Sequence, residues 1–128
     1  MQIRAPRLRV LWHAIGYLLI GLVVVFSLMP NPPEVPDDPG NWSGHLLAYG
    51  TLMAWFAQLH ERLATRLAIA LGFVALGVSM EFLQGLTDYR TYDVFDMLAN
   101  TCGVALGLIA SPPRVPNGLR GVERLLAR

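Results

Sequence analysis

Four long apolar segments restrict what this chain can fold into more than any other feature of the sequence. They cover approximately residues 10–29, 44–59, 67–86 and 94–110. A helix needs about 20 mostly apolar residues to cross a bilayer, because the hydrocarbon is ~30 Å thick and each residue rises ~1.5 Å. Only 15% of the residues are charged, against roughly 25% in a typical soluble domain. The sequence therefore predicts an all-α integral membrane bundle of four transmembrane helices, built as one domain over residues 1–128.

The first segment also has the order of a signal peptide, with arginines before an apolar run. The apolar core of a signal peptide is usually only about 7–15 residues long and is followed by a small-residue cleavage site. Here the run is longer and leads into a proline-rich stretch at residues 29–40. We therefore expect residues 10–29 to be retained as a helix and residues 29–40 to form an extended loop, because proline cannot donate a backbone hydrogen bond.

The arginines predict the orientation of the four helices. Nine of the ten arginines precede the first segment, separate the second from the third, or follow the fourth, and the exception is Arg90. Arginines flank the cytoplasmic ends of membrane helices. Both termini and the turn at residues 59–66 are therefore predicted to be cytoplasmic, and the proline-rich loop and the Arg90 loop to face outwards. The basic tail at residues 111–128 suits the anionic cytoplasmic leaflet and contains a short predicted helix at about residues 117–126.

The same composition disfavours a nucleic-acid-binding protein and restricts the role of cysteine. A nucleic-acid-binding protein requires a basic face or stripe, and the long apolar segments contain almost no basic residues. The chain's single cysteine, Cys102, rules out an internal disulfide and a cysteine-cluster metal site. We expect no metal, no other cofactor and no nucleic acid, and we expect membrane lipids as partners.

Six of the polar residues in the second, third and fourth apolar segments lie near the predicted outer end. An ionisable residue inside a membrane helix costs about 2.5–3.5 kcal/mol even on lenient scales, so it has to face protein or water. At ~1.5 Å per residue, the six lie within roughly 10–12 Å of the outer interface. They are His45, Tyr49, Glu81, Gln84, Asp96 and Asn100. Their common depth predicts a polar pocket that opens outwards.

The spacing of these residues places them on shared helix faces, because residues three or four apart are neighbours on a helix. His45 and Tyr49 are four residues apart, and Glu81 and Gln84 are three apart. Gly77 extends the face of Glu81 inwards. A single stripe on the fourth segment joins the polar residues Asp96 and Asn100 to two small ones, Gly103 and Gly107.

Glycines four residues apart allow close helix packing in membranes. The stripe therefore predicts helix contact at depth and polar groups near the outer mouth. The Gly103–Gly107 face also suits contact with a second copy in a homo-oligomer.

Two further residues belong to the predicted site. Arg90 adjoins the pocket and is expected to act as the counter-ion of one of its acids, or to meet an anionic ligand through its two-pronged guanidinium group. Asp93 either contributes to the pocket or caps the fourth helix, since an aspartate before a helix accepts hydrogen bonds from first-turn amides.

The ordered set of motifs resembles the VanZ-like family of small bacterial membrane proteins. The motifs are His45-Leu46-Leu47-Ala48-Tyr49, Glu81-x-x-Gln84 and Arg90-x-x-Asp93-x-x-Asp96-x-x-x-Asn100-x-x-Gly103. The resemblance implies a multi-pass protein of the bacterial cytoplasmic (inner) membrane with a role in the cell envelope, such as susceptibility to the glycopeptide teicoplanin. The family's typical Asp-Lys pair before the histidine is replaced here by Asn41-Trp42.

Four functional interpretations remain open. The first is recognition of an envelope component, such as a lipid-linked precursor or another amphiphile, in the pocket. The second is a purely structural network, although interhelical polar contacts in membranes average only about 0.6 kcal/mol. The third is an enzyme that acts on a lipid or lipid-linked substrate through Glu81, Asp96 and His45. The fourth is a transporter, which is disfavoured because the polar groups stop in the outer half.

The enzyme interpretation lacks the usual sequence signatures. The chain has no His-Glu-x-x-His motif and no Gly-x-Ser-x-Gly nucleophile elbow. One histidine with two acids is also a small ligand set for zinc. The sequence therefore favours recognition over catalysis.

Overall fold

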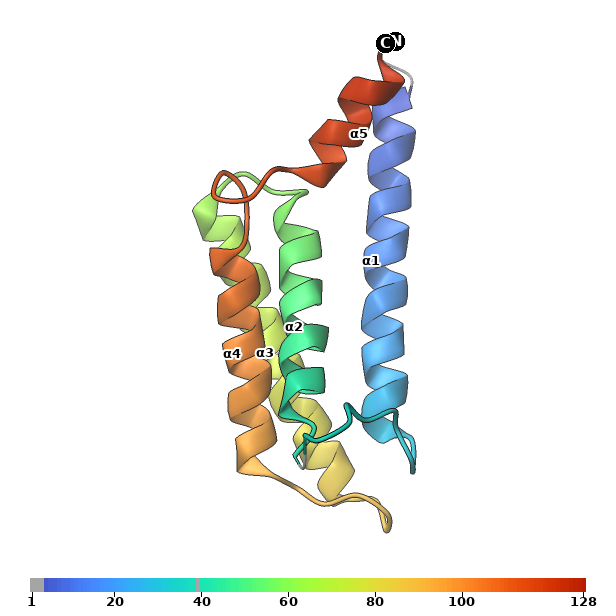
Figure 1. The fold of residues 1–128 in the computed structure, drawn as a ribbon, viewed down its shortest axis with the longest axis vertical. Helices are drawn as coiled ribbons and strands as arrows, with labels where there is room; N and C mark the ends of the chain where they lie inside the picture. The colour runs from blue at the N-terminus through green and yellow to red at the C-terminus, as the bar shows by residue number, and fades with distance from the viewer. Residues whose placement is uncertain (1–3, 39) are drawn as a thin grey trace.

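Helices account for all the regular secondary structure in residues 4–38 and 40–128, which are the residues described by the computed structural model. The five helices of this part of the chain are α1 (Arg4–Leu28), α2 (Trp42–Ala57), α3 (Leu63–Gly85), α4 (Val94–Ile109) and α5 (Gly118–Leu126). The predicted all-α class is confirmed. The helices α1 and α3 run in one direction, and α2 and α4 run in the other (Figure 1).

Two of these helices, α1 and α3, contain stretches long and apolar enough to cross a membrane by themselves, at Pro6–Leu28 and Leu63–Gly85. The helices α2 and α4 have 16 residues each, which corresponds to about 24 Å and is shorter than the hydrocarbon layer. The four-span arrangement therefore stays a prediction.

Some helices begin before the apolar runs that predict them. The helix α1 begins at Arg4, because arginine and leucine are good helix formers and Pro6 is tolerated within a first turn. The helix α3 begins at Leu63 and so includes Arg66, which lies buried. Arginine side chains do not break a helix, so the apolar pattern marks the membrane-compatible part of a helix rather than its ends.

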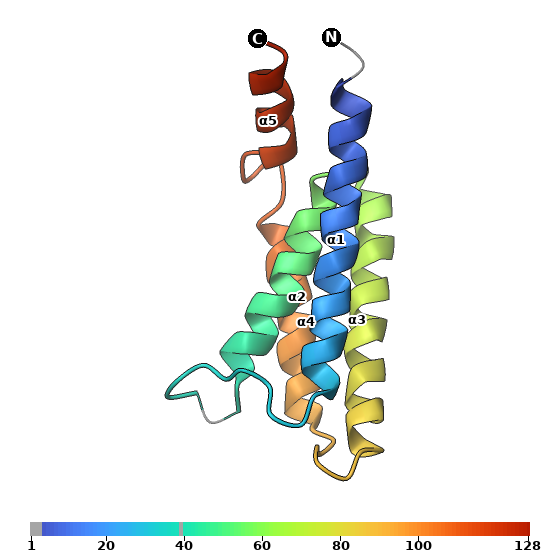
Figure 2. The same cartoon turned by 90° about the vertical axis from the view of Figure 1, so that its right-hand side faces the viewer.

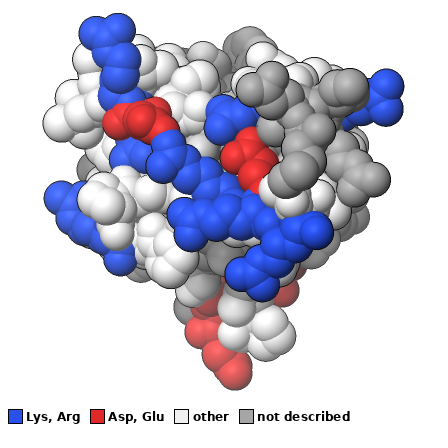
Figure 3. All heavy atoms as spheres, turned by 90° about the horizontal axis from the view of Figure 1, so that it is seen from above, with Lys and Arg blue, Asp and Glu red and all other residues white. Residues whose placement is uncertain are grey.

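The two ends of the bundle differ sharply in charge. The first turn of α1, the C-terminus, the α2–α3 turn and the α4–α5 connection lie at one end, which we call the arginine end (Figures 1 and 2). The α1–α2 and α3–α4 loops lie at the other, which we call the acidic end. The arginine end has nine of the ten arginines, and the acidic end has seven of the nine acidic residues. Seen from above in Figure 3, arginine side chains run across the arginine end around a few acidic groups.

The closest helix contact joins α2 to α4 through glycines. A Cβ atom on Gly103 would lie 2.7 Å from the carbonyl oxygen of Leu46, and one on Gly107 would overlap the carbonyl oxygen of Gly50. Backbone therefore meets backbone along this seam, as the small-residue pattern predicts. In the structure α2 occupies the Gly103–Gly107 face, so a contact between two copies would have to use another surface.

The helix α1 packs on α2 through aromatic side chains rather than through a glycine seam. Near the arginine end Trp12 stacks on Trp55 of α2, with ring centroids 4.2 Å apart. The indole N–H of Trp55 also donates to the carbonyl oxygen of Trp12 at 2.9 Å. One turn further along, a Cβ atom on Gly16 would lie 2.7 Å from the ring of Phe56. Between these contacts and the acidic end, α1 leaves room beside α2.

Replacement of Gly107 by alanine should destabilise the bundle, because the added methyl group has no space against α2. We expect a loss of about 1–3 kcal/mol, as for other overpacked positions. Gly72 on α3 is the matched control, since a Cβ atom there meets nothing within 4 Å. Gly72→Ala should be neutral or stabilising by up to about 1 kcal/mol, because alanine is the better helix former. The free energy of unfolding in mixed detergent micelles measures both, and equal effects of the two variants would contradict the role of the seam.

Candidate functional site

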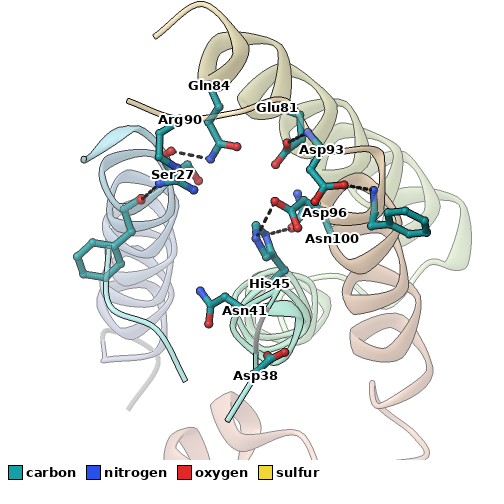
Figure 4. A network of polar contacts seen from close by, with 12 residues as sticks. Ser27, Asp38, Asn41, His45, Glu81, Gln84, Arg90, Asp93, Asp96 and Asn100 are labelled. Carbon is teal, nitrogen blue, oxygen red and sulfur yellow. Dashed lines mark hydrogen bonds and ion pairs between the residues drawn. The ribbon is translucent and has the colours of Figure 1, made fainter. Parts of the chain in front are cut away.

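His45 lies at the centre of the polar groups at the acidic end (Figure 4). Its Nδ1 lies 2.8 Å from Oδ1 of Asn100 in a hydrogen bond, and its Nε2 lies 3.5 Å from Oδ2 of Asp96. These contacts follow from the packing of α4 on α2, which runs parallel to it. Gly103 contacts the backbone at Leu46, so Asn100 and Asp96, one and two turns before Gly103, lie beside His45. Both ring nitrogens face oxygen atoms of α4.

Glu81 connects α3 to the beginning of α4. Its side chain is fully buried, and its Oε2 accepts a hydrogen bond from the backbone N–H of Asp93 at 3.0 Å. Asp93 in turn caps α4, because its carboxylate accepts from the N–H of Phe95 at 2.8 Å. The capping role proposed for Asp93 is therefore present in the structure, and Glu81 fixes the capping residue.

Gln84, near the end of α3, and Arg90, in the α3–α4 loop, connect this part of the chain to α1. The side-chain amide of Gln84 donates to the carbonyl oxygen of Ser27 at 2.6 Å. The guanidinium group of Arg90 donates to the carbonyl oxygen of Met29 at 3.2 Å and reaches that of Phe26 at 3.5 Å. A cation at the C-terminal end of a helix interacts favourably with the helix dipole. Arg90 thus binds the end of α1. It forms no ion pair with an acid of the residues that the structure describes.

A cavity of about 280 Å³ lies between α1, α2 and the α1–α2 loop, beside the histidine. Its walls combine apolar side chains with polar groups from four parts of the chain. They are Val23, Phe26, Ser27, Pro32, Pro33, Asn41, Gly44, His45, Leu47, Ala48, Tyr49, Gln84 and Arg90.

The predicted site residues therefore fall into two groups. His45, Tyr49, Gln84 and Arg90 line the cavity. Glu81, Asp93, Asp96 and Asn100 do not line it; they lie on α3, at the cap of α4 and on α4, and His45 connects the two groups. Gly77 allows this packing, because a Cβ atom there would lie 3.0 Å from that of Asn100 and 3.4 Å from the ring of Tyr49.

The sequence did not identify the α1 wall or the loop that covers the cavity. The α1 wall is apolar apart from Ser27, which binds through its backbone, so no side-chain pattern marks it. The loop is organised by Asn41, which adopts a left-handed conformation with φ of 51° and accepts the N–H of Val35 at 3.0 Å. Asparagine tolerates this conformation better than most residues, and its position before a helix after a run of prolines is the signal available in the sequence.

A second loop contact joins Asp38 to the first turn of α2. Its Oδ2 accepts a hydrogen bond from the backbone N–H of Ser43 at 2.6 Å. This bond favours the charged carboxylate and lowers the pKa of Asp38 below its ordinary value. Both α2 and α4 thus begin at the acidic end with an aspartate on first-turn amides.

Several buried polar atoms at the acidic end have no partner among the described residues. They are Tyr49 Oη, Gln84 Oε1, Glu81 Oε1 and Asp96 Oδ1. An unpaired buried polar atom costs about 1–3 kcal/mol, so it favours any bound group that supplies a hydrogen bond. Two of them, on Tyr49 and Gln84, belong to residues that line the cavity.

No three His, Cys, Asp or Glu side chains converge on one point in the part of the chain that the structure describes. His45, Glu81 and Asp96, the ligand set considered for a metal-dependent enzyme, are not assembled around a common centre. The geometry supports hydrogen bonding and charge, with His45 as the shared residue.

Comparison with known proteins gives one family match and one curated relative. The family model described as VanZ/LLP1 matches residues 14–112. A protein of Schizosaccharomyces pombe, described as uncharacterized protein C11E3.10, is 30% identical over 95 residues, which cover 72% of this chain. The chain spans 59% of the length of that relative. No solved structure gives a significant match.

Replacement of Glu81 by alanine should loosen the start of α4, because the N–H of Asp93 loses its acceptor. We expect a loss of about 1–3 kcal/mol in the free energy of unfolding, together with faster hydrogen exchange at the Asp93 amide. Glu81→Gln retains an acceptor oxygen and should lose less. Ser79→Ala, at an exposed position of the same helix, is the control and should change stability by less than about 0.5 kcal/mol. Equal losses of stability in the alanine and glutamine variants would contradict the proposed role of the acceptor oxygen in holding the start of α4.

Proposed function

Because the chain belongs to the VanZ/LLP1 family, we propose that it is a multi-pass membrane protein whose cavity beside His45 binds the polar part of an amphiphile. Two helices with the length and hydropathy of membrane spans support the membrane location. The exposed apolar side chains along α1 and α3 support it further, since a protein surface in lipid is apolar. Examples are Leu18, Val25 and Leu71.

The cavity is the observation that carries the proposal. Its walls are apolar along α1 and α2, at Val23, Phe26 and Leu47, and polar at Gln84 and Arg90. Ligand sites are typically concave and mostly apolar, with a few convergent polar groups. The unpaired oxygens of Tyr49 and Gln84 supply hydrogen-bonding capacity, and the guanidinium group supplies positive charge. An amphiphile matches both parts, with its chain against the apolar wall.

The orientation of the molecule follows from its charge. Arginines favour the cytoplasmic side, so the arginine end would face the cytoplasm and the cavity would open outwards. In a bacterial inner membrane, this position gives access to lipids and lipid-linked precursors of the envelope. The family resemblance is the basis for extending this to glycopeptide susceptibility, including that to teicoplanin. The relative comes from a yeast, which has no bacterial cell wall, so a membrane lipid is also a candidate for the bound amphiphile.

A second candidate function is catalysis on a lipid or lipid-linked substrate. The pair formed by His45 and Asp96 favours it, because a histidine oriented by a carboxylate is a common general base. In the structure, however, the second ring nitrogen binds Asn100, and neither nitrogen points freely into the cavity. Recognition therefore has the stronger support, and turnover of an envelope lipid that depends on His45 would reverse this order.

Labelling of single cysteines tests the orientation. In a Cys102→Ser background, a cysteine in place of Asp38 should react with a membrane-impermeant maleimide added to intact cells. A cysteine in place of Arg120 should react only after the membrane is opened, because it lies at the arginine end. Reaction of both cysteines from the same side would contradict the proposed four crossings.

A large side chain in the cavity should displace the amphiphile. Ala48 lines the cavity, and Ala48→Phe would fill it and weaken binding by about 1–3 kcal/mol, the usual cost of overpacking, or roughly 5- to 150-fold in affinity. Mass spectrometry of lipids extracted with the purified protein measures the loss. Ala105→Phe, on an exposed face of α4, is the matched control and should retain the wild-type amount. Equal retention in both variants would remove the cavity as the binding site.

A further inference from the structure

The arginine end contains a second hollow, on the opposite end of the bundle from the cavity. It has a volume of about 320 Å³ and lies between the α2–α3 turn, the α4–α5 connection and α5. Three of its residues are arginines and one is acidic. The lining residues are Glu61, Arg66, Pro112, Pro113, Val115, Pro116, Asn117, Arg120 and Arg124.

Arg66 is the most unusual of these residues, because its charge is buried without an acidic partner. Only 8% of its surface is exposed. Its Nε donates to the carbonyl oxygen of His60 at 2.6 Å, and its Nη1 contacts the carbonyl oxygen of Pro112 and the hydroxyl of Ser111. These oxygens are neutral, and the second terminal nitrogen, Nη2, has no hydrogen bond within residues 4–38 and 40–128. A buried cation without a counter-charge is unfavourable unless an anion approaches it.

The helix that carries two of these arginines, Arg120 and Arg124, is anchored beside the same hollow. Leu119 is fully buried beneath α5, and its N–H donates to Oε1 of Gln58 at 3.1 Å. The side-chain amide of Asn117 donates to the carbonyl oxygen of Gln58 at 3.0 Å, which fixes the start of the helix. Because α5 is anchored in this way, the backbone at Arg120 and Arg124 has a defined position relative to Arg66, although both side chains are exposed.

The charge of the hollow is positive even after internal pairing. Arg120 pairs with Glu61 at the surface, whereas Arg66 and Arg124 form no ion pair with any acid of the described residues. Two uncompensated guanidinium groups therefore line one hollow. Guanidinium groups bind phosphate oxygens in pairs of parallel hydrogen bonds, which makes arginine the preferred residue for phosphate recognition.

We propose that the hollow at the arginine end binds an anionic phosphate group, with Arg66 and Arg124 as its principal ligands and Glu61 as an internal competitor for Arg120. A lipid headgroup and a free phosphate ion share this chemistry. The position favours access from the membrane surface, because Arg66 lies in the first turn of α3, one of the two helices with the character of a membrane span. The proposal is independent of the cavity at the acidic end.

Binding to the purified full chain in detergent tests the proposal and separates the two sources. Native mass spectrometry measures the retention of phosphatidylglycerol against phosphatidylcholine, and calorimetry measures the binding of inorganic phosphate. Preferential retention of phosphatidylglycerol that excess inorganic phosphate does not displace identifies a lipid headgroup. Direct binding of inorganic phosphate that displaces the lipid identifies a free anion. Binding of neither probe overturns the proposal.

Three exposed side chains provide matched variants. Arg124→Gln should weaken binding about tenfold or more, because a direct hydrogen bond between charged groups is lost. Glu61→Gln should strengthen binding, because it releases Arg120 from its ion pair. Arg114→Gln changes the net charge as Arg124→Gln does, but Arg114 does not line the hollow, so binding should change less than about twofold, because single contributions at the surface are small. Equal losses in the two arginine variants would overturn the proposal in favour of diffuse attraction.

Discussion

The contact between the backbones of α2 and α4 is the constraint on which the acidic end of this bundle depends. Where Gly103 meets Leu46 and Gly107 meets Gly50, the two parallel helices lie too close for any side chain. The contact fixes their relative height, and the residues that precede it on each helix then face one another. The hydrogen bond between His45 and Asn100 follows from this register rather than producing it, because one polar contact is worth much less than the packing of a whole seam.

The position of α1 follows a different principle. It packs on α2 near the arginine end through Trp12 and Gly16, and at the acidic end it is bound through its carbonyl oxygens by Gln84 and Arg90. These two polar side chains use the unpaired carbonyls that every helix leaves in its last turn. The space between the two sets of contacts becomes the cavity, so Gln84 and Arg90, which hold α1, also contribute to the polar part of the cavity wall.

The sequence predicts the residues of this region better than it predicts their partners. The stripe from Asp96 to Gly107 and the pair formed by His45 and Tyr49 could be read from helical spacing, because a 3.6-residue period is a local property. The partners depend on which helices are neighbours, and local spacing carries no such information. Arg90 therefore appeared to be a counter-ion for the acids, whereas it binds carbonyl oxygens of α1. The charge pattern predicts only that Arg66 lies at the cytoplasmic end with the other arginines, whereas in the structure the α4–α5 connection contacts it and it is buried.

The glycine seam also determines how far the structural effect of a substitution extends through the molecule. Glycine and alanine have no side-chain rotamers to lose on folding, so the seam forms without a side-chain entropy cost. For the same reason it has no rotamers with which to absorb a change. A larger residue at Gly107 can be accommodated only by moving a whole helix, and α4 carries Asn100 and Asp96 with it. The seam therefore sets the distances between His45 and the polar residues of α4. A single methyl group added at Gly107, far from His45, is enough to change these distances.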